Sequence, residues 1–229
     1  MTTATTTNIS KQTLGILKNF SSINSNILIS PGNVIKTISP MKNIMSKSTV
    51  KETFDTEFGI WDLNKFLGTV SLFENPEFDF EEKYVTISGK GSSSVKYFYC
   101  EPRLLTTVNK EITMPESVVD FELTNDNFSE VQRAASVLQL PDIAVKSSND
   151  DIELVALDKS DSTTNTFSIT VGKNKNDADF SFYFKAENLK MISGDYNVNI
   201  TDKIVSQFTN NNLDLNYWIA LESDSTYQG

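Results

Sequence analysis

The sequence predicts an α+β protein built from two similar domains. Helical and strand patterns occur in one order, helix, strands, helix, strands, and the same order restarts after a polar break near residue 103. Within the first half, the segment LGILKNF at residues 14–20 is echoed by LGTVSLF at residues 67–73, 53 residues further on. A glycine inside a helix costs about 1 kcal/mol relative to alanine. Its recurrence at one position therefore indicates a structural unit used more than once.

The first domain is expected over residues 10–102, after a threonine-rich arm at residues 1–9 that we expect to be disordered. Ser10 can cap a helix that runs to about Phe20, and Asp62 can cap a second helix that ends near Phe73. Residues 39–48 are predicted to form a loop. Short apolar runs between turn residues predict strands. These runs are residues 26–30, 34–38, 49–54, 84–88 and 94–100.

Residues 103–117 have no clean periodicity and are interpreted as an interdomain connector. The second domain is expected over residues 118–229. A third helix should begin at Thr124 or Asn125 and stop before Pro141, and a short fourth helix should span about Ala186 to Ile192. Alternating apolar residues predict antiparallel strands that keep one face wet. The alternation is seen at residues 118–123, 143–145, 152–156, 167–171, 180–184 and, as the last of three further strands, 213–221.

The composition argues against catalysis. The chain has 229 residues, is 38% hydrophobic, and contains no histidine and one cysteine, so imidazole-based chemistry, most zinc sites and an intrachain disulfide are excluded. No phosphate-binding or calcium-binding motif occurs. We therefore expect no enzyme, no metal and no cofactor. A carboxylate enzyme is the alternative, but the acids lie in connections between elements. No apolar run reaches the ~20 residues that span a bilayer, and no signal-peptide pattern begins the chain, so we expect no membrane contact.

The charge distribution is more informative than the net charge of −10, which alone argues against nucleic-acid binding. Basic residues gather on helix faces that lie opposite the apolar stripes, whereas acids cluster in connections. One interpretation is an ordinary solvated helix face. The other is a common surface that contacts the phosphates of a nucleic acid without reading its bases. The residues concerned are Lys11, Lys18, Lys65, Arg133 and Lys190, with Lys185 just before the fourth helix.

Specific stretches in order along the chain resemble the DNA polymerase sliding clamp of T-even-type bacteriophages, a family of processivity factors. The resemblance covers about residues 10–226. Four stretches carry it: LKNF at 17–20 with INS at 23–25, DLN at 62–64 with FLG at 66–68, NLKM at 188–191 with Gly194 and Tyr196, and NY at 216–217 with ALE at 220–222 and DST at 224–226.

This resemblance implies two similar DNA-clamp domains in each subunit, two helices packed on antiparallel sheet in each domain, and a closed ring of three identical subunits. Helices would line the central hole, and sheets would form the outer wall. It further implies that the clamp encircles duplex DNA and has three kinds of protein partner: an ATP-driven clamp loader, the replicative DNA polymerase, and factors of late transcription. The protein would act in the cytoplasm of the infected bacterial host. The alternative is a non-catalytic, β-rich structural or virion oligomer with no role at DNA.

Three sets of site residues follow from the resemblance. The six cations named above would face DNA. Edge strands at residues 94–100 and 166–172 would pair between subunits, unless they are ordinary edge or internal strands; their interface residues are Val95, Tyr97, Phe98 and Tyr99, and Phe167, Ile169 and Val171. A groove for partner peptides would be bordered by Ile112, Met114 and Pro115, with Val119 and Tyr217 beneath, unless these residues only pack the connector.

Overall fold

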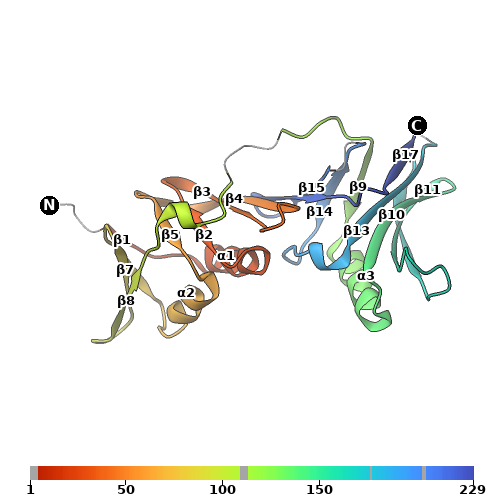
Figure 1. Cartoon of the computed structure of the whole chain (residues 1–229). Helices are drawn as coiled ribbons and strands as arrows, with labels where there is room; N and C mark the ends of the chain where they lie inside the picture. Colours follow the sequence, from red (N-terminus) through yellow and green to blue (C-terminus); the bar gives the residue numbers. More distant parts are fainter. Residues whose placement is uncertain (1–4, 109–112, 176, 203–204) are drawn as a thin grey trace. The chain divides into compact units, whose positions relative to one another are not determined.

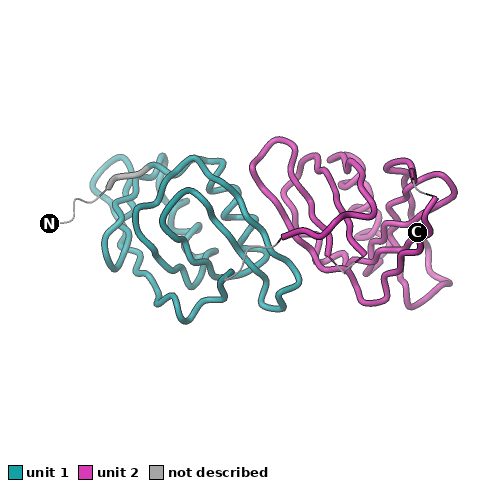
Figure 2. The backbone as a smooth tube through the Cα atoms, turned by 90° about the horizontal axis from the view of Figure 1, so that it is seen from above, with its two compact units in different colours: residues 1–110 teal, residues 111–229 magenta. Residues whose placement is uncertain are grey.

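The structure is a computed structural model that describes the whole chain except residues 1–4, 109–112, 176 and 203–204. The chain divides into two compact units, residues 1–110 and residues 111–229 (Figure 2). The division falls inside the range assigned above to the connector. Each unit is described by itself below.

Both units contain the same order of elements: strand, helix, four strands, helix or helical turn, and a final set of strands (Figure 1). Unit 1 consists of β1 (Thr5–Thr7), α1 (Lys11–Ile23), β2 (Ile27–Ile29), β3 (Gly32–Ile38), β4 (Ile44–Phe54), β5 (Phe58–Ile60), α2 (Leu63–Val70), β6 (Glu77–Phe80), β7 (Tyr84–Ser88), β8 (Ser94–Phe98) and the 3-10 turn η1 (Pro102–Leu104).

Unit 2 consists of β9 (Val119–Leu123), α3 (Asn125–Leu138), β10 (Asp142–Ser148), β11 (Asp151–Leu157), β12 (Phe167–Lys173), β13 (Asp179–Lys185), the 3-10 turn η2 (Ala186–Asn188), β14 (Tyr196–Ile200), β15 (Val205–Asn210), β16 (Leu215–Ala220) and β17 (Thr226–Gln228). The strand pairings within each unit are antiparallel, as predicted. The repeated order confirms two similar α+β units.

Sheet order places β8 and β12 at sheet edges. In unit 1, four strands pair in the order β1-β6-β7-β8, while β2 pairs with β5 and β3 pairs with β4. In unit 2, one sheet has the order β12-β11-β10-β13-β17, and β16, β15, β14 and β9 pair in that sequence. Strands β8 and β12 are thus each the last strand of a sheet.

Helices α1 and α3 begin in the same way, as expected for repeated units. Ser10 Oγ accepts a hydrogen bond from the backbone N–H of Thr13 at 3.2 Å, and Thr124 Oγ1 accepts one from Asn127 at 3.2 Å. Both are N-caps at the positions that the sequence predicts. The helix α1 runs past Phe20 to Ile23, because its apolar stripe continues by one turn.

Aromatic side chains dominate the core of each unit. In unit 1, Phe20, Phe66 and Phe78 are essentially inaccessible to solvent. In unit 2, Phe182 and Phe184 of β13 are buried equally well. Each such side chain contributes roughly 1.5–3 kcal/mol through burial, so the helices are held mainly by these contacts and not by their intrinsic helix propensity.

The prediction of a fourth helix is wrong. Its place is taken by the three-residue turn η2, and the described residues contain three α-helices. Side chains from outside the turn satisfy the backbone that follows it. Tyr196 Oη donates to the carbonyl of Ile192 at 2.5 Å, Tyr217 Oη accepts from the N–H of Ile192 at 3.2 Å, and Gln132 Nε2 donates to the carbonyl of Leu189 at 3.1 Å. These contacts replace a helical ladder, so the described part of unit 2 has one α-helix where two were expected.

Two loop predictions also need correction. The loop predicted at residues 39–48 is shorter, because β4 begins at Ile44 and Ser39 Oγ closes the turn by accepting from the N–H groups of Asn43 and Ile44. The arm predicted at residues 1–9 is structured from residue 5, since β1 pairs with β6. A sheet partner that is distant in sequence stabilises this segment despite its polar composition.

Glu52 of β4 fixes the start of α1 from behind. Its carboxylate is 7% exposed and accepts hydrogen bonds from the backbone N–H of Ser10 and from Thr13 Oγ1, each at 2.5 Å. Burial raises the pKa of Glu52, but the hydrogen bonds from Thr13 and Ser10 outweigh burial and lower the pKa below its ordinary value of 4.5. Because the folded-state pKa is the lower one, this stabilisation is complete above pH 4.5 and is lost as pH falls through the folded-state value.

We predict that Glu52→Gln lowers the free energy of unfolding by about 1–3 kcal/mol at neutral pH, since a buried set of donors loses its charged acceptor. The loss should shrink as the pH falls below 4.5. Denaturant unfolding at several pH values measures both effects. Glu57→Gln, at an exposed glutamate, is the matched control. Equal unfolding free energies for the two variants at neutral pH would contradict the anchoring role.

Candidate nucleic-acid interface and subunit edges

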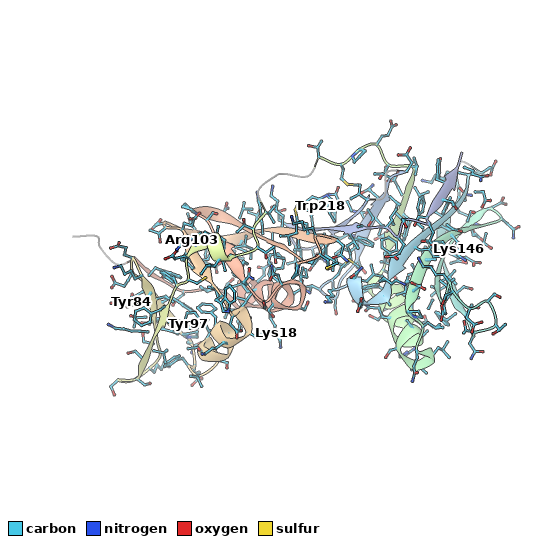
Figure 3. All side chains as sticks on the ribbon, viewed as in Figure 1. Lys18, Tyr84, Tyr97, Arg103, Lys146 and Trp218 are labelled. Atoms are coloured by element: carbon cyan, nitrogen blue, oxygen red, sulfur yellow. The ribbon has the colours of Figure 1, made fainter. Side chains whose placement is uncertain are left out.

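The cations of unit 1 lie on two neighbouring helices. Helices α1 and α2 lie side by side (Figure 1). Lys11 and Lys18 on α1, and Lys65 on α2, are exposed, whereas the apolar residues Leu17 and Phe66 face the core. Lys18 extends from α1 away from β3 and β4 (Figure 3). Since α1 has no acidic residue, its outer face carries only basic and uncharged residues.

The cations of unit 2 come from two adjoining segments. Arg133 is exposed on α3, and Lys190 is exposed just after η2. The hydrogen bond from Gln132 to the carbonyl of Leu189 joins these segments directly. Arg133 and Lys190 therefore follow residues that contact each other, although the expected fourth helix is absent from the described residues.

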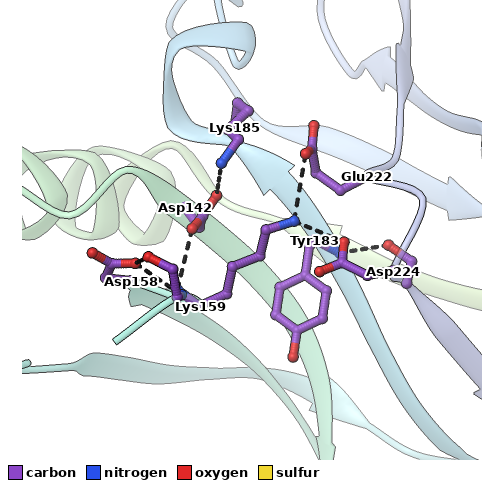
Figure 4. Close-up of polar contacts among 9 residues, drawn as sticks. Asp142, Asp158, Lys159, Tyr183, Lys185, Glu222 and Asp224 are labelled. Atoms are coloured by element: carbon purple, nitrogen blue, oxygen red, sulfur yellow. Dashed lines mark hydrogen bonds and ion pairs between the residues drawn. The ribbon is translucent and has the colours of Figure 1, made fainter. Parts of the chain in front are cut away.

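Lys185 differs from the other five cations. Its ammonium group lies 2.7 Å from Asp142 Oδ1, and the Asp142 side chain is 1% exposed (Figure 4). The second oxygen of Asp142 accepts from the backbone N–H of Lys159 at 3.2 Å. A buried carboxylate needs such partners. The charge of Lys185 is thus bound within unit 2, and a structural role explains it.

Lys159 forms a second polar cluster beside this pair (Figure 4). Its ammonium group lies 2.7 Å from Asp224 and 3.4 Å from Glu222, and it sits 5.4 Å from the ring centre of Tyr183. Desolvation lowers the pKa of Lys159, but the Asp224 and Glu222 carboxylates outweigh it and raise the pKa overall. The cluster fixes the C-terminal segment against β13. No sequence pattern indicates this cluster, because its members are far apart in the chain.

The edge strand β8 has an incompletely covered inner face. Val85 and Ile87 on β7 are fully buried, but Val95 and Tyr97 on β8 are only partly covered. Tyr97 packs edge-to-face on Phe66 at 5.2 Å, so α2 lies beneath this edge.

The other aromatic residues at this edge have different roles. Phe98 points to the opposite face, is 67% exposed and contacts Tyr84 at a ring distance of 5.4 Å. Tyr99 follows the strand and stacks on Phe58 at 5.1 Å. Its location in the core raises the pKa of Tyr99 by desolvation. Phe98 is therefore available to a partner, whereas Tyr99 mainly fills unit 1.

The edge strand β12 shows the same pattern. Leu154 and Ala156 on β11 are buried, but Phe167, Ile169 and Val171 on β12 remain partly exposed. Helix α3 packs on β11 and β12, so this edge also has a helix beneath it.

Sequence reasoning missed exposed apolar residues at the C-terminal ends of the helices beneath both edges. Val137 at the end of α3 is 75% exposed, and Leu72 just after α2 is 71% exposed. Their apolar character at positions outside the helical stripes was the signal that could have found them. Exposed apolar side chains are typical of an interaction surface where they adjoin other exposed apolar residues.

The residues predicted for a peptide groove fall into three groups. Ile112 lies outside the described residues. Met114 and Pro115 are partly exposed in the connector segment of unit 2. Val119 and Tyr217 are buried, and Tyr217 is inaccessible to solvent. The last two therefore occupy positions beneath the surface, and Tyr217 belongs to the core of unit 2.

Neither a metal centre nor a membrane-spanning helix is found in the described residues. Across these ranges, no three Cys, Asp or Glu side chains come together in a way that could hold a metal ion. No helix within them has the length and apolar character needed to cross a bilayer.

Comparison with known proteins gives one consistent answer. Residues 10–103 match the family described as DNA polymerase processivity factor, and residues 120–223 match the family described as gp45 sliding clamp, C terminal. The sliding clamp of Vibrio phage KVP40 is 32% identical over 220 residues, which cover 94% of this chain and 99% of that protein. The sliding clamp of Escherichia phage RB69 is 28% identical over 226 residues, covering 96% and 98%.

The fold agrees with these matches. PCNA of A. fulgidus, solved with the C-terminal region of FEN-1 bound, superposes with a TM-score of 0.69 at 14% identity and covers 93% of this chain and 96% of its own. The two units therefore have the DNA-clamp fold. The chain belongs to the family of bacteriophage sliding clamps, which confirms the resemblance noted in the sequence.

Proposed function

We propose that this protein encircles duplex DNA as a ring and tethers the replicative DNA polymerase for processive synthesis. The observation that carries this proposal is the 32% identity to a phage sliding clamp over nearly the full length of both chains. The basic outer faces of α1 and α2 in an acidic chain are independent support, because an enclosed duplex needs only weak phosphate contacts.

The ring consists of three copies that meet head to tail, with β8 of one copy pairing with β12 of the next. Such an interface closes into a ring when the rotation that relates successive copies brings the last copy back to the first. Both strands are sheet edges with partly exposed apolar inner faces, so pairing them would satisfy backbone groups and complete the burial of Val95, Ile169 and Val171. The exposed Leu72, just after α2, and Val137, at the end of α3, would extend the same contact.

The DNA-facing residues are Lys11, Lys18, Lys65, Arg133 and Lys190. Lys185 is left out, because Asp142 already binds it. Acids on the remaining surface disfavour nonspecific binding of DNA there, since each chain has a net charge of −10. Contacts limited to a few cations keep the duplex free to slide, whereas a strongly binding surface would stop it.

The protein's partners are an ATP-driven clamp loader, the replicative polymerase and, in a second role, factors of late transcription. Their peptides would dock near Met114 and Pro115 of the connector. The protein itself is non-catalytic and acts in the cytoplasm of the infected bacterial cell. A structural oligomer is the competing function, and it predicts no dependence on DNA topology.

Retention on DNA tests the function and the cation assignment together. We predict that the protein, loaded by a clamp loader, stays on nicked circular DNA and leaves when the circle is cut. Replacing Lys11, Lys18 and Lys65 with glutamine should reduce retention and flatten its dependence on salt. The logarithmic salt slope should fall by up to about 0.9 for each phosphate that is no longer neutralised.

The control replaces Lys51, Lys83 and Lys90, which are exposed outside the helices of unit 1, and changes the net charge equally. Retention that survives linearisation would contradict encirclement. An equal effect of the two triple variants would contradict the DNA-facing assignment.

Charge placed at the edge strands tests the ring interface. Ile169→Lys on β12 and Phe98→Glu on β8 should each give monomers, because a charge buried beside an unpaired strand is strongly unfavourable. Sedimentation velocity at several protein concentrations measures the change. Met41→Glu, at a side chain that is 83% exposed in the β3–β4 turn, is the control and should assemble normally. Normal assembly of the β8 and β12 variants would contradict this pairing.

A further inference from the structure

A groove between α1 and α2 has an apolar floor that the proposed function does not use, although Lys11 and Lys18 on its rim are among the DNA-facing residues proposed above. Its volume is about 600 Å³, and its walls come from α1 with the preceding residues Asn8 and Ile9, from α2, and from the segment 71–77 that follows α2. Ligand-binding pockets in proteins typically measure about 300–1,000 Å³. The groove lies wholly within unit 1, so its geometry does not depend on assembly.

The floor of the groove is apolar. Leu14 of α1, Leu67 of α2 and Phe73 line it and remain partly exposed, while Val70 is buried deeper. Apolar side chains that stay accessible in a concave site favour a ligand with apolar groups of its own.

Gly15 keeps the α1 wall of this groove open. A Cβ atom built on Gly15 meets no atom of another described element within 4 Å. Packing inside the chain therefore does not require a glycine here, although glycine weakens a helix. The missing side chain leaves room in the groove that a larger residue would fill.

The rim of the groove on the α1 side is positive. Lys11 and Lys18 are exposed, lie one turn before and one turn after Gly15, and both line the groove. The positive end of the α1 dipole adds to their field at Lys11. Glu77 lines the groove as well, so the attraction for an anion is greatest along α1.

We propose that this groove binds an extended partner peptide in which large apolar side chains alternate with acidic ones. The apolar floor would hold the former, and Lys11 and Lys18 would contact the latter. Duplex DNA fits less well, because its phosphates can reach exposed lysines without entering an apolar groove and gain nothing from its floor.

The protein's own N-terminal arm is also a poor occupant. Residues 1–8 have the sequence MTTATTTN, without a charged side chain or an aromatic ring. Strand β1 runs along β6 so that Thr7 pairs with Phe78 and Thr5 with Phe80. From Thr7 to Thr5, the strand therefore runs away from the groove-lining residues Pro76 and Glu77.

Two probes test the proposal on the full-length protein. One is 8-anilinonaphthalene-1-sulfonate, an apolar anion whose fluorescence reports binding. The other is a capped, labelled peptide that alternates aspartate with phenylalanine and leucine, compared with a twin that has lysine in place of aspartate. Both anionic probes should bind the wild type at one site per chain, and the lysine twin should bind much more weakly.

Gly15→Leu is the decisive variant, because it fills the groove from a position where the structure has open space. It should weaken the binding of both probes about tenfold or more. Gly15→Ala should retain most of the binding and raise the midpoint of thermal unfolding. Lys18→Gln should weaken them about two- to fivefold, as expected for one exposed charge pair.

Unchanged probe affinity in Gly15→Leu, or equal binding of the lysine twin, would overturn the proposal.

Binding of a 20-base-pair duplex tests DNA as the alternative occupant. If Gly15→Leu weakens duplex binding as much as probe binding, the groove belongs to the DNA surface and the peptide assignment fails. Circular dichroism confirms folding of each variant.

Discussion

The proposed ring depends on the backbone groups at two sheet edges, β8 and β12. Among the described residues, no strand of the same unit lies beside the outer N–H and C=O groups of β8 and β12, and apolar residues on their inner faces are incompletely buried. An open edge of this kind recruits another strand. In the proposed ring, pairing between copies would satisfy the backbone groups and bury Val95 and Ile169 in one step. In that proposal, the position of each DNA-facing cation would follow from this pairing, because the ring must close before any helix can line its hole.

A second constraint acts on α1, which is held in place only by contacts on its core-facing side. Glu52 binds the first turn, and Phe20 and Leu17 enter the core. The outer face is left without acids and, at Gly15, without a side chain. The same bare face can therefore serve both weak phosphate contacts and the groove between α1 and α2. The two proposals assign Lys11 and Lys18 to both surfaces, so a peptide in the groove and a duplex beside α1 would compete for the same charges.

Local signals predicted α1, α3 and most strands, because caps at Ser10 and Thr124 and regular apolar spacing act within one segment. The same reasoning failed at residues 186–192, where the hydroxyl groups of Tyr196 on the next strand and of Tyr217 on the more distant β16 hydrogen-bond to the backbone. The exposure of the helix cations could be predicted from the helical period. The ion pair of Lys185 with Asp142 could not, since the two residues meet only through the sheet. The groove could not be predicted from the sequence either, because it depends on how α1 packs on α2.

The most direct test of the central claim is amide hydrogen exchange of β8 and β12 as a function of protein concentration. The amides that point away from β7 and β11 should be protected at concentrations where the protein is assembled, and they should exchange rapidly after dilution or in Ile169→Lys. Rapid exchange of these amides in the fully assembled protein would contradict edge-to-edge pairing and, with it, the ring described here.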